Sequence, residues 1–218
     1  MIYIIAVLTA LVAYLIGSIS GAIILSKKIS GEDIRTEGSK NAGTTNMLRV
    51  HGKGAGAVTL ILDALKGVVA ILAAMLLNIW LRGVAPESIF VGNLGYIAGL
   101  FAVIGHDFPL FFGFKGGKGV ATSLGVILML NWQIGLIVLI IAILTMIISR
   151  YVSLGSILAA VIYPVLVLVF MIGEKRYNKI YLACIVVMAI LLIAKHHGNI
   201  SRLRKGTENK LFSKKDKE

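Results

Sequence analysis

The stretch GVATSLGVILMLNWQIGLIVLIIAILTMIIS, residues 119–149, contains no charged side chain and decides how often this chain crosses a membrane. It is long enough for one span, or for two spans joined at Asn131-Trp132-Gln133. Counting Lys and Arg separates the two arrangements, because cytoplasmic loops are enriched in both residues. Two spans place 17 of the 22 Lys and Arg residues on one side and 4 on the other, whereas one span divides them 11 against 10. We therefore predict two spans joined by a turn at the membrane interface.

The composition is that of a membrane protein. Of 218 residues, 58% are hydrophobic and 15% are charged, and the mean hydropathy is +0.92. A water-soluble domain has about 25% charged residues, so the composition excludes a soluble globular protein. Most of the net charge of +12 is expected to fix the orientation and to bind anionic lipid. The single cysteine, Cys184, excludes an internal disulfide.

The predicted fold is an all-α integral membrane protein with seven transmembrane helices, its N-terminus outside and its C-terminus cytoplasmic. The predicted spans are 1–25, 55–77, 88–104, 120–130, 134–148, 152–172 and 180–194. The fourth is short for a bilayer core that takes about 20 residues, so it must tilt or include the preceding glycines. We expect 1–204 to form one membrane-embedded domain and 205–218 to form a basic cytoplasmic tail, to which any disorder is confined.

Three polar, glycine-containing segments fall together on the predicted cytoplasmic face, and the first is residues 34–54. It concentrates hydroxyl and amide side chains around Gly38 and Gly43, which allow the backbone to bend. Such side chains either cap helices and solvate a loop, or line a polar pocket. In a pocket, the planar fork of Arg49 would suit a phosphate.

The second segment, residues 105–122, surrounds Lys118 with glycines. Backbone N–H groups of a glycine loop can converge on an anion, and a helix starting near Val120 would add the positive end of its dipole. It is not a Walker A loop, because Gly119 stands where that motif requires Ser or Thr. An anion-binding loop and a flexible connector both explain the glycines.

The third segment, residues 195–208, follows the last predicted span, and its basic residues serve topology or anionic lipid in the simplest interpretation. His196 and Asn199 differ, because their spacing of three places both on one helical face. In the second span, Asp63 and Lys66 share a face by the same spacing, and either a structural ion pair or a role in a site would explain them. The chain has no HExxH motif and no histidine–carboxylate cluster, so we predict no metal and no cofactor.

Together the three segments resemble the bacterial acyl-phosphate:glycerol-3-phosphate acyltransferase family, integral membrane enzymes of phospholipid synthesis. The matching motifs are Ser39-x-Asn41-x-Gly43-x-Thr45-Asn46-x-x-Arg49, Gly105-His106-x-x-Pro109 with Phe114-Lys115-Gly116-Gly117-Lys118-Gly119-Val120-Ala121-Thr122, and His196-x-x-Asn199-Ile200-x-Arg202-Leu203-x-x-Gly206-x-Glu208. Two departures are Ser20, where Pro is common, and His197, where Arg is expected. The departure at position 197 leaves open whether His196 or His197 is the functional histidine, and the spacing to Asn199 favours His196.

The resemblance implies transfer of a fatty acyl group from acyl phosphate to the first (sn-1) hydroxyl of glycerol 3-phosphate, giving lysophosphatidic acid and phosphate. Within that reaction, we predict that the residues that act in both catalysis and glycerol 3-phosphate binding are Ser39, Arg49, Lys118, His196 and Asn199. We expect the donor phosphate to be held by Gly116, Gly117, Gly119 and Thr122. The expected supporting residues are Asn41, Thr45, Asn46, His106, Arg202 and Glu208.

The residue types suit that chemistry, since both substrates contain a phosphate and the chain offers cations and glycines to bind it. The His-x4-Asp pattern of another acyltransferase class is absent, because no histidine is followed by Asp five positions later. The proton of the attacking hydroxyl could pass to His196 or to a substrate phosphate. The competing function is an organic-phosphate transporter or channel, which would need polar residues through the membrane midplane.

The expected partners follow from the same resemblance. They are acyl phosphate, glycerol 3-phosphate, membrane lipid and a soluble enzyme that supplies acyl phosphate, with no nucleic acid. The expected location is the bacterial cytoplasmic membrane, crossed several times, with the active site facing the cytoplasm.

Overall fold

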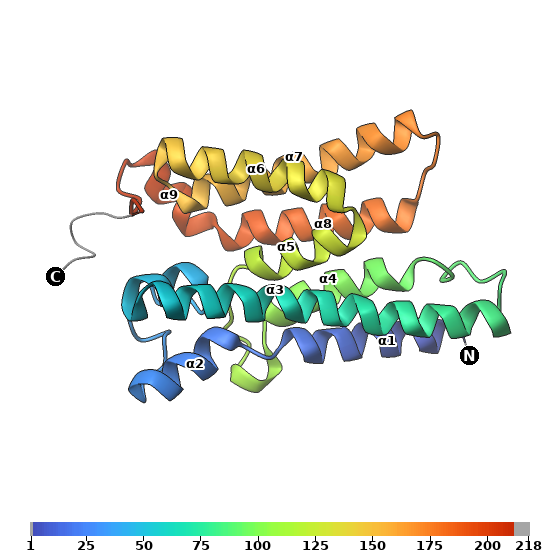
Figure 1. The fold of residues 1–218 in the computed structure, drawn as a ribbon, viewed down its shortest axis with the longest axis horizontal. Coiled ribbons are helices and arrows are strands. Elements are labelled where there is room, and N and C mark those ends of the chain that lie inside the picture. Colours follow the sequence, from blue (N-terminus) through green and yellow to red (C-terminus); the bar gives the residue numbers. More distant parts are fainter. Residues whose placement is uncertain (1, 212–218) are drawn as a thin grey trace. The chain divides into compact units, whose positions relative to one another are not determined.

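The computed structural model describes residues 2–211 of the chain, and over that range it contains helices and no strand (Figure 1). The chain divides into two compact units, one ending at Leu130 and the other starting at Asn131. This boundary falls at the turn predicted inside the long uncharged stretch, which therefore forms two helices and not one. Residues 212–218 of the predicted basic tail lie outside the described residues.

The first unit packs its helices through small residues. Its elements are α1 (Ile2–Gly17), α2 (Gly21–Ser30), α3 (Thr44–Val84), α4 (Leu94–Asp107), the short 3-10 helix η1 (Leu110–Phe112) and α5 (Val120–Leu130). Helix α4 packs against α1 and α3, and α5 packs against α3 (Figure 1). A Cβ atom on Gly17 would overlap the carbonyl of Ala102, and one on Gly125 would overlap the carbonyl of Ala64. These glycines therefore let the backbones of α1 and α4, and of α3 and α5, approach closely.

The described part of the second unit, residues 131–211, contains four helices. They are α6 (Trp132–Ser149), α7 (Val152–Gly173), α8 (Lys179–Lys195) and α9 (His197–Arg204). Helix α7 packs against α6 and α8, and the buried hydroxyl groups of Tyr163 and Tyr181 lie 2.7 Å apart between α7 and α8. Helix α9 is bent by 55° from α8, so the last span does not continue straight into the third polar segment.

The predicted spans correspond largely to helices, except at residues 18–20 and 88–93, and the helix surfaces are those of a membrane protein. Among residues 2–211, five helical segments are long and apolar enough to cross a membrane, or six if the bent pair α8–α9 is one span. The exception is α5, which has 11 residues and is therefore about 16 Å long. Large apolar side chains are widely exposed, Ile148 by 82% and Leu76 by 70%. Such exposure is favourable against lipid and unfavourable against water, so the chain is a multi-pass membrane protein.

The first predicted span is interrupted. The helix breaks at residues 18–20, where the hydroxyl of Ser18 accepts a hydrogen bond from the backbone N–H of Leu110 at 3.2 Å and Ser20 caps the start of α2. A Pro at position 20 would lack this capping hydroxyl. The apolar sequence did not indicate the break, and one of its contacts is with a residue 92 positions later.

The first polar segment is not a loop throughout, and here the prediction is wrong. Residues 44–51 form the first turns of α3, and the direction changes at Gly52, whose φ of 84° is left-handed. Met47 in these turns is fully buried in an apolar cluster with Ala22, Ile23 and Ile34. Packing of this side chain stabilises a helix in a sequence whose Ser, Thr and Asn content favours turns.

Candidate functional site

Asn46 organises the first polar segment. Its side chain is fully buried near the start of α3. Oδ1 accepts a hydrogen bond from the backbone N–H of Ser39 at 2.8 Å, while Nδ2 donates to the carbonyls of Ile34 and Glu37, both at 3.0 Å. One amide thus satisfies three backbone groups of the loop that precedes α3. It fixes the backbone at Ser39, which is itself exposed.

The other candidates of this segment are Asn41, Thr45 and Arg49, all half-buried. Thr45 and Arg49 are four residues apart in α3 and therefore lie on one face of that helix. The backbone bends at both glycines, as predicted: at Gly38, whose φ is 55°, and at Gly43, whose φ is −164°, directly before α3.

An ion pair that the sequence interpretation missed joins the first two polar segments. The guanidinium of Arg35 donates from Nε to Oδ1 of Asp33 at 2.9 Å and from Nη2 to Oδ2 at 2.8 Å. Its Nη1 also donates to the carbonyls of Phe112 at 2.7 Å and Lys115 at 2.9 Å. The side-chain hydrogen bond from Arg35 holds the pKa of the Asp33 carboxyl below its usual 3.8 and raises the pKa of the guanidinium. The only signal in the sequence was an Asp-x-Arg pair in a polar loop.

The glycine loop of the second segment lies on the C-terminal end of α4. The backbone N–H of Gly117 donates to the carbonyl of His106 at 3.1 Å. A Cβ on Gly116 would overlap that carbonyl, and a Cβ on Gly117 would overlap Nε2 of the His106 ring. Gly119 has a left-handed φ of 74°. The glycines therefore serve close approach and a tight turn, which a flexible connector would not require.

The loop leads directly into α5, which begins at Val120 as predicted. Lys118 is half-buried just before this helix. Thr122 and Ser123 in its first turn are buried, and neither hydroxyl has a hydrogen-bond partner among residues 2–211. Buried hydroxyls normally have a partner, and the first turn of a helix presents backbone N–H groups and a positive dipole end. This arrangement can bind an anion such as phosphate.

Beneath the loop, the predicted pairing of Asp63 with Lys66 is confirmed. Nζ of Lys66 lies 3.0 Å from Oδ1 of Asp63 in α3 and 2.8 Å from Nδ1 of His106 in α4. All three side chains are buried. The pair is thus part of a cluster that borders the glycine loop through His106.

In the second unit, Glu208 organises the third polar segment. Its Oε1 accepts hydrogen bonds from Nδ2 of Asn199 at 2.6 Å and from the hydroxyl of Ser153 at 2.8 Å, and its Oε2 accepts from Nε of Arg202 at 2.7 Å. Burial acts to raise the pKa of this carboxyl, but the hydrogen bonds from Asn199, Ser153 and Arg202 outweigh burial, and the pKa lies below its usual 4.5. The chain beyond α9 is thereby fastened to the start of α7.

Because the folded-state pKa of Glu208 is depressed, its stabilisation is complete above about pH 4.5 and is lost as the pH falls through the folded-state value. We expect Glu208→Gln to lower the free energy of unfolding by about 2 kcal/mol at pH 7, because one charged acceptor is lost from a nearly buried site. The difference from the unsubstituted protein should shrink at pH 4. Thermal unfolding in detergent measures both. Glu174→Gln, at an exposed position, is the control, and an equal effect of that substitution would contradict the assignment.

His196 is buried at the junction of α8 and α9. Its Nδ1 lies 2.8 Å from the carbonyl oxygen of Leu192. A carbonyl only accepts hydrogen bonds, so Nδ1 is the donor, and in a neutral ring Nε2 is the nitrogen that can accept a proton. The predicted single helical face of His196 and Asn199 is not formed by the last span itself: His196 is the residue at the bend between α8 and α9, and Asn199 lies in α9.

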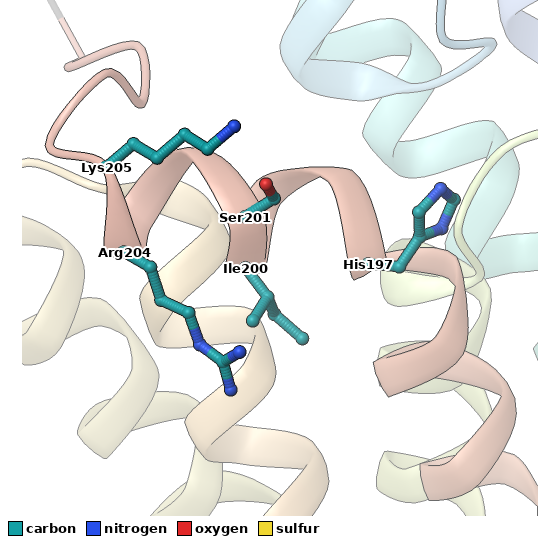
Figure 2. Close-up of a pocket in the computed structure, with 5 residues that line it drawn as sticks. All are labelled: His197, Ile200, Ser201, Arg204 and Lys205. Carbon is teal, nitrogen blue, oxygen red and sulfur yellow. The ribbon is translucent and has the colours of Figure 1, made fainter.

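A pocket of about 370 Å³ lies on α9 and is lined by His197, Ile200, Ser201, Arg204 and Lys205 (Figure 2). None of the predicted site residues is among these five. His197 is exposed here whereas its neighbour His196 is buried. The pocket is basic and adjoins the tail, as expected of a surface that meets anionic headgroups.

The predicted residues thus fall into two groups. The first and second segments lie in one unit and contact each other through Arg35. They also approach closely at Gly117, where a Cβ atom would lie 2.7 Å from the carbonyl of Ala42. The third segment is ordered within the other unit around Glu208. Besides Arg35, the sequence interpretation did not single out Ser123 or Ser153.

Comparison with known proteins gives matches along nearly the whole chain. The family model described as glycerol-3-phosphate acyltransferase matches residues 7–206. Curated proteins named glycerol-3-phosphate acyltransferase are similar throughout. That of Shouchella clausii is 45% identical over 206 residues, covering 94% of this chain and 96% of its own. That of Clostridioides difficile is 44% identical over 210 residues, covering 96% and 97%.

Two solved structures of PlsY (YgiH), described as an integral membrane glycerol 3-phosphate acyltransferase, have a similar fold. The glycerol 3-phosphate form has a TM-score of 0.79 at 35% identity and covers 94% of this chain and 95% of its own. The lysophosphatidic acid form has a TM-score of 0.76 at 33% identity, with 94% of each chain covered. By sequence along nearly its whole length and by fold, this chain belongs to the glycerol-3-phosphate acyltransferase family.

Proposed function

We propose that this protein transfers a fatty acyl group from acyl phosphate to the sn-1 hydroxyl of glycerol 3-phosphate, giving lysophosphatidic acid and inorganic phosphate. The observation that supports an acyl phosphate donor is the glycine loop at the start of α5, with the buried Thr122 hydroxyl beside it. This loop suits a phosphate attached directly to the acyl group. The solved PlsY structures, named for glycerol 3-phosphate and lysophosphatidic acid, support the acceptor and the product.

In the proposed reaction, the hydroxyl oxygen of glycerol 3-phosphate attacks the acyl carbonyl carbon. The bond between that carbon and the phosphate oxygen breaks, and phosphate leaves with the electron pair. The hydroxyl proton passes to His196 or to a substrate phosphate oxygen. A mixed anhydride has a good leaving group, so alignment of the two substrates supplies most of the acceleration.

The predicted residues divide between the two substrates. Gly116, Gly117, Gly119 and Thr122 bind the donor phosphate. Ser39, Arg49, Lys118, His196 and Asn199 bind glycerol 3-phosphate, and Lys118 or loop N–H groups stabilise the oxyanion. Asn46, His106 and Glu208 hold segments of these groups in place, as their hydrogen bonds support. Asn41, Thr45 and Arg202 complete the supporting set.

We also propose seven spans, an outer N-terminus and an active site facing the cytoplasm in the bacterial cytoplasmic membrane. The division of Lys and Arg, 17 against 4, supports this orientation. Helix α5 would be the short fourth span, with the glycine loop at one end. A soluble enzyme would then supply acyl phosphate from the cytoplasm, and residues 1–204 would act as one membrane-embedded domain.

Purified full-length protein in detergent, given palmitoyl phosphate and labelled glycerol 3-phosphate, should form lysophosphatidic acid and phosphate in equal amounts. Palmitoyl-CoA and palmitoyl-acyl carrier protein, tested in parallel, should give no product, because neither presents a phosphate on the acyl carbon. Phosphorus and carbon NMR of the product assigns the acylated hydroxyl.

Product from the thioesters alone would contradict the donor, and acylation at the second hydroxyl would contradict the position. If no donor gives product and the protein in liposomes takes up glycerol 3-phosphate, the chain is a transporter.

A further inference from the structure

A buried cluster of ionisable groups lies beside the glycine loop. Asp63, Lys66 and His106 are exposed by only 1%, 7% and 5%. Asp63 and Lys66 lie within the long apolar helix α3, where ionisable groups are costly to bury. Replacement of a buried ion pair by apolar side chains is often neutral for stability, so stability alone is a weak reason for this pair. Its contacts point to a second role.

The hydrogen bonds of Lys66 fix the state of the His106 ring. Nζ lies 2.9 Å from the carbonyl of Ile19, 3.0 Å from Oδ1 of Asp63 and 2.8 Å from Nδ1 of His106. An ammonium group donates hydrogen bonds and accepts none, so a charged Lys66 makes Nδ1 of His106 the acceptor, and the ring proton then lies on Nε2. Asp63 acts on both groups through its charge, since its Oδ1 lies 3.0 Å from Nζ of Lys66 and 3.5 Å from Nδ1 of His106.

Nε2 is the ring atom that faces the glycine loop. A Cβ on Gly117 would overlap it, and the carbonyl of the same histidine accepts the N–H of Gly117 at 3.1 Å. Both ends of His106 therefore border one residue of the loop. Next to Lys66, Gly67 of α3 would place a Cβ 2.7 Å from the carbonyl of Thr122, so the cluster also adjoins the first turn of α5.

We infer that Asp63 and Lys66 are positioning residues for phosphate binding. Asp63 holds the ammonium of Lys66, Lys66 sets the tautomer of His106, and His106 presents its Nε2–H toward the loop of residues 116–119. The site for the donor phosphate is then preorganised by a chain of contacts running from the interior of α3. This inference rests on the proposed function, because it assigns the loop to acyl phosphate.

The test compares three variants with the unsubstituted enzyme. The double substitution Asp63→Leu with Lys66→Met removes the ion pair without leaving a buried charge unpaired. We expect it to raise the KM for palmitoyl phosphate and to lower kcat/KM for that donor by about 10- to 100-fold, while the KM for glycerol 3-phosphate stays within about two-fold. His106→Gln can keep an N–H directed at the loop and should retain more activity than His106→Phe, which keeps the ring size alone.

The matched control is Tyr163→Phe with Tyr181→Phe, which removes a buried hydrogen bond from the other unit. It should lower the thermal midpoint without changing either KM. An unchanged KM for palmitoyl phosphate in the Asp63/Lys66 double variant would overturn the inference, as would equal activities of His106→Gln and His106→Phe. An unsubstituted enzyme that is inactive with palmitoyl phosphate would instead refute the proposed function.

Discussion

Lys118→Ala is expected to lower kcat/KM for acyl transfer by about 100- to 1000-fold, the cost of removing one group that stabilises a developing oxyanion. Lys118 is half-buried between the glycines and the start of α5, where its charge is only partly screened by water. The loss should be divided between kcat and the KM for glycerol 3-phosphate. Steady-state kinetics in detergent with both substrates varied would measure it, with the thermal midpoint recorded for each variant.

Lys115→Ala provides the control for total charge. Lys115 lies three residues earlier in the same segment and is exposed, and its contact with Arg35 uses the backbone carbonyl, which the substitution keeps. We expect kcat/KM within about two-fold of the unsubstituted enzyme, as is usual for a rim charge in water. If Lys118→Ala and Lys115→Ala reduce kcat/KM equally, the effect comes from the total positive charge of the segment and not from Lys118. Near-normal kcat and KM values for Lys118→Ala would exclude Lys118 from phosphate binding.

Gly117→Ala should reduce kcat/KM by about 100-fold or more, because one methyl group cannot be placed without moving the loop. The added Cβ would overlap Nε2 of His106 and lie 2.7 Å from the carbonyl of Ala42. Neither neighbour can yield easily, since one belongs to the buried cluster with Lys66 and the other is backbone. A displacement of about 1 Å at a site that aligns two substrates costs on the order of 100-fold. Initial rates with palmitoyl phosphate would measure the loss.

Gly83→Ala separates this steric effect from a general effect of glycine replacement. A Cβ at Gly83, near the C-terminal end of α3, meets no atom within 4 Å. Ala is favoured over Gly in a helix by about 1 kcal/mol, so activity should be unchanged and the thermal midpoint equal or higher. Full activity of Gly117→Ala would show that the glycine loop tolerates displacement, which would contradict its proposed role in binding the donor phosphate.

The sequence was sufficient for the long apolar helices. Uncharged stretches located most of their residues, and the predicted turn at Asn131-Trp132-Gln133 lies where α5 and α6 meet, although only Asn131 is outside the helices. Asn131 caps α6, because its Oδ1 accepts a hydrogen bond from the N–H of Ile134. Glycine spacing around Lys118 predicted the start of α5. These features are local, since hydropathy, helix caps and turns depend on neighbouring residues.

The features that escaped prediction depend on residues far apart in the chain. The break between α1 and α2 includes a hydrogen bond with Leu110. The helical turns after Thr44 depend on the buried Met47. The link between the first two polar segments is made by Arg35, which binds the carbonyl of Phe112. The side chains of Arg35 and Lys66 donate to backbone carbonyls, which every residue has. The identity of the acceptor residue therefore cannot be predicted from the sequence, and only the fold identifies the contact.

The hydrogen bonds from Arg35 to the second polar segment also set an order of events during synthesis. Phe112, whose carbonyl it binds, lies 77 positions later, so at 5–20 residues per second it emerges about 4 to 15 s after Arg35. Asp33, the other partner of the guanidinium in the folded protein, is only two residues away. The glycine loop can be fastened only after α3 and α4 have been made and brought together. Fixing of the glycine loop by Arg35 is thus a late step of chain insertion.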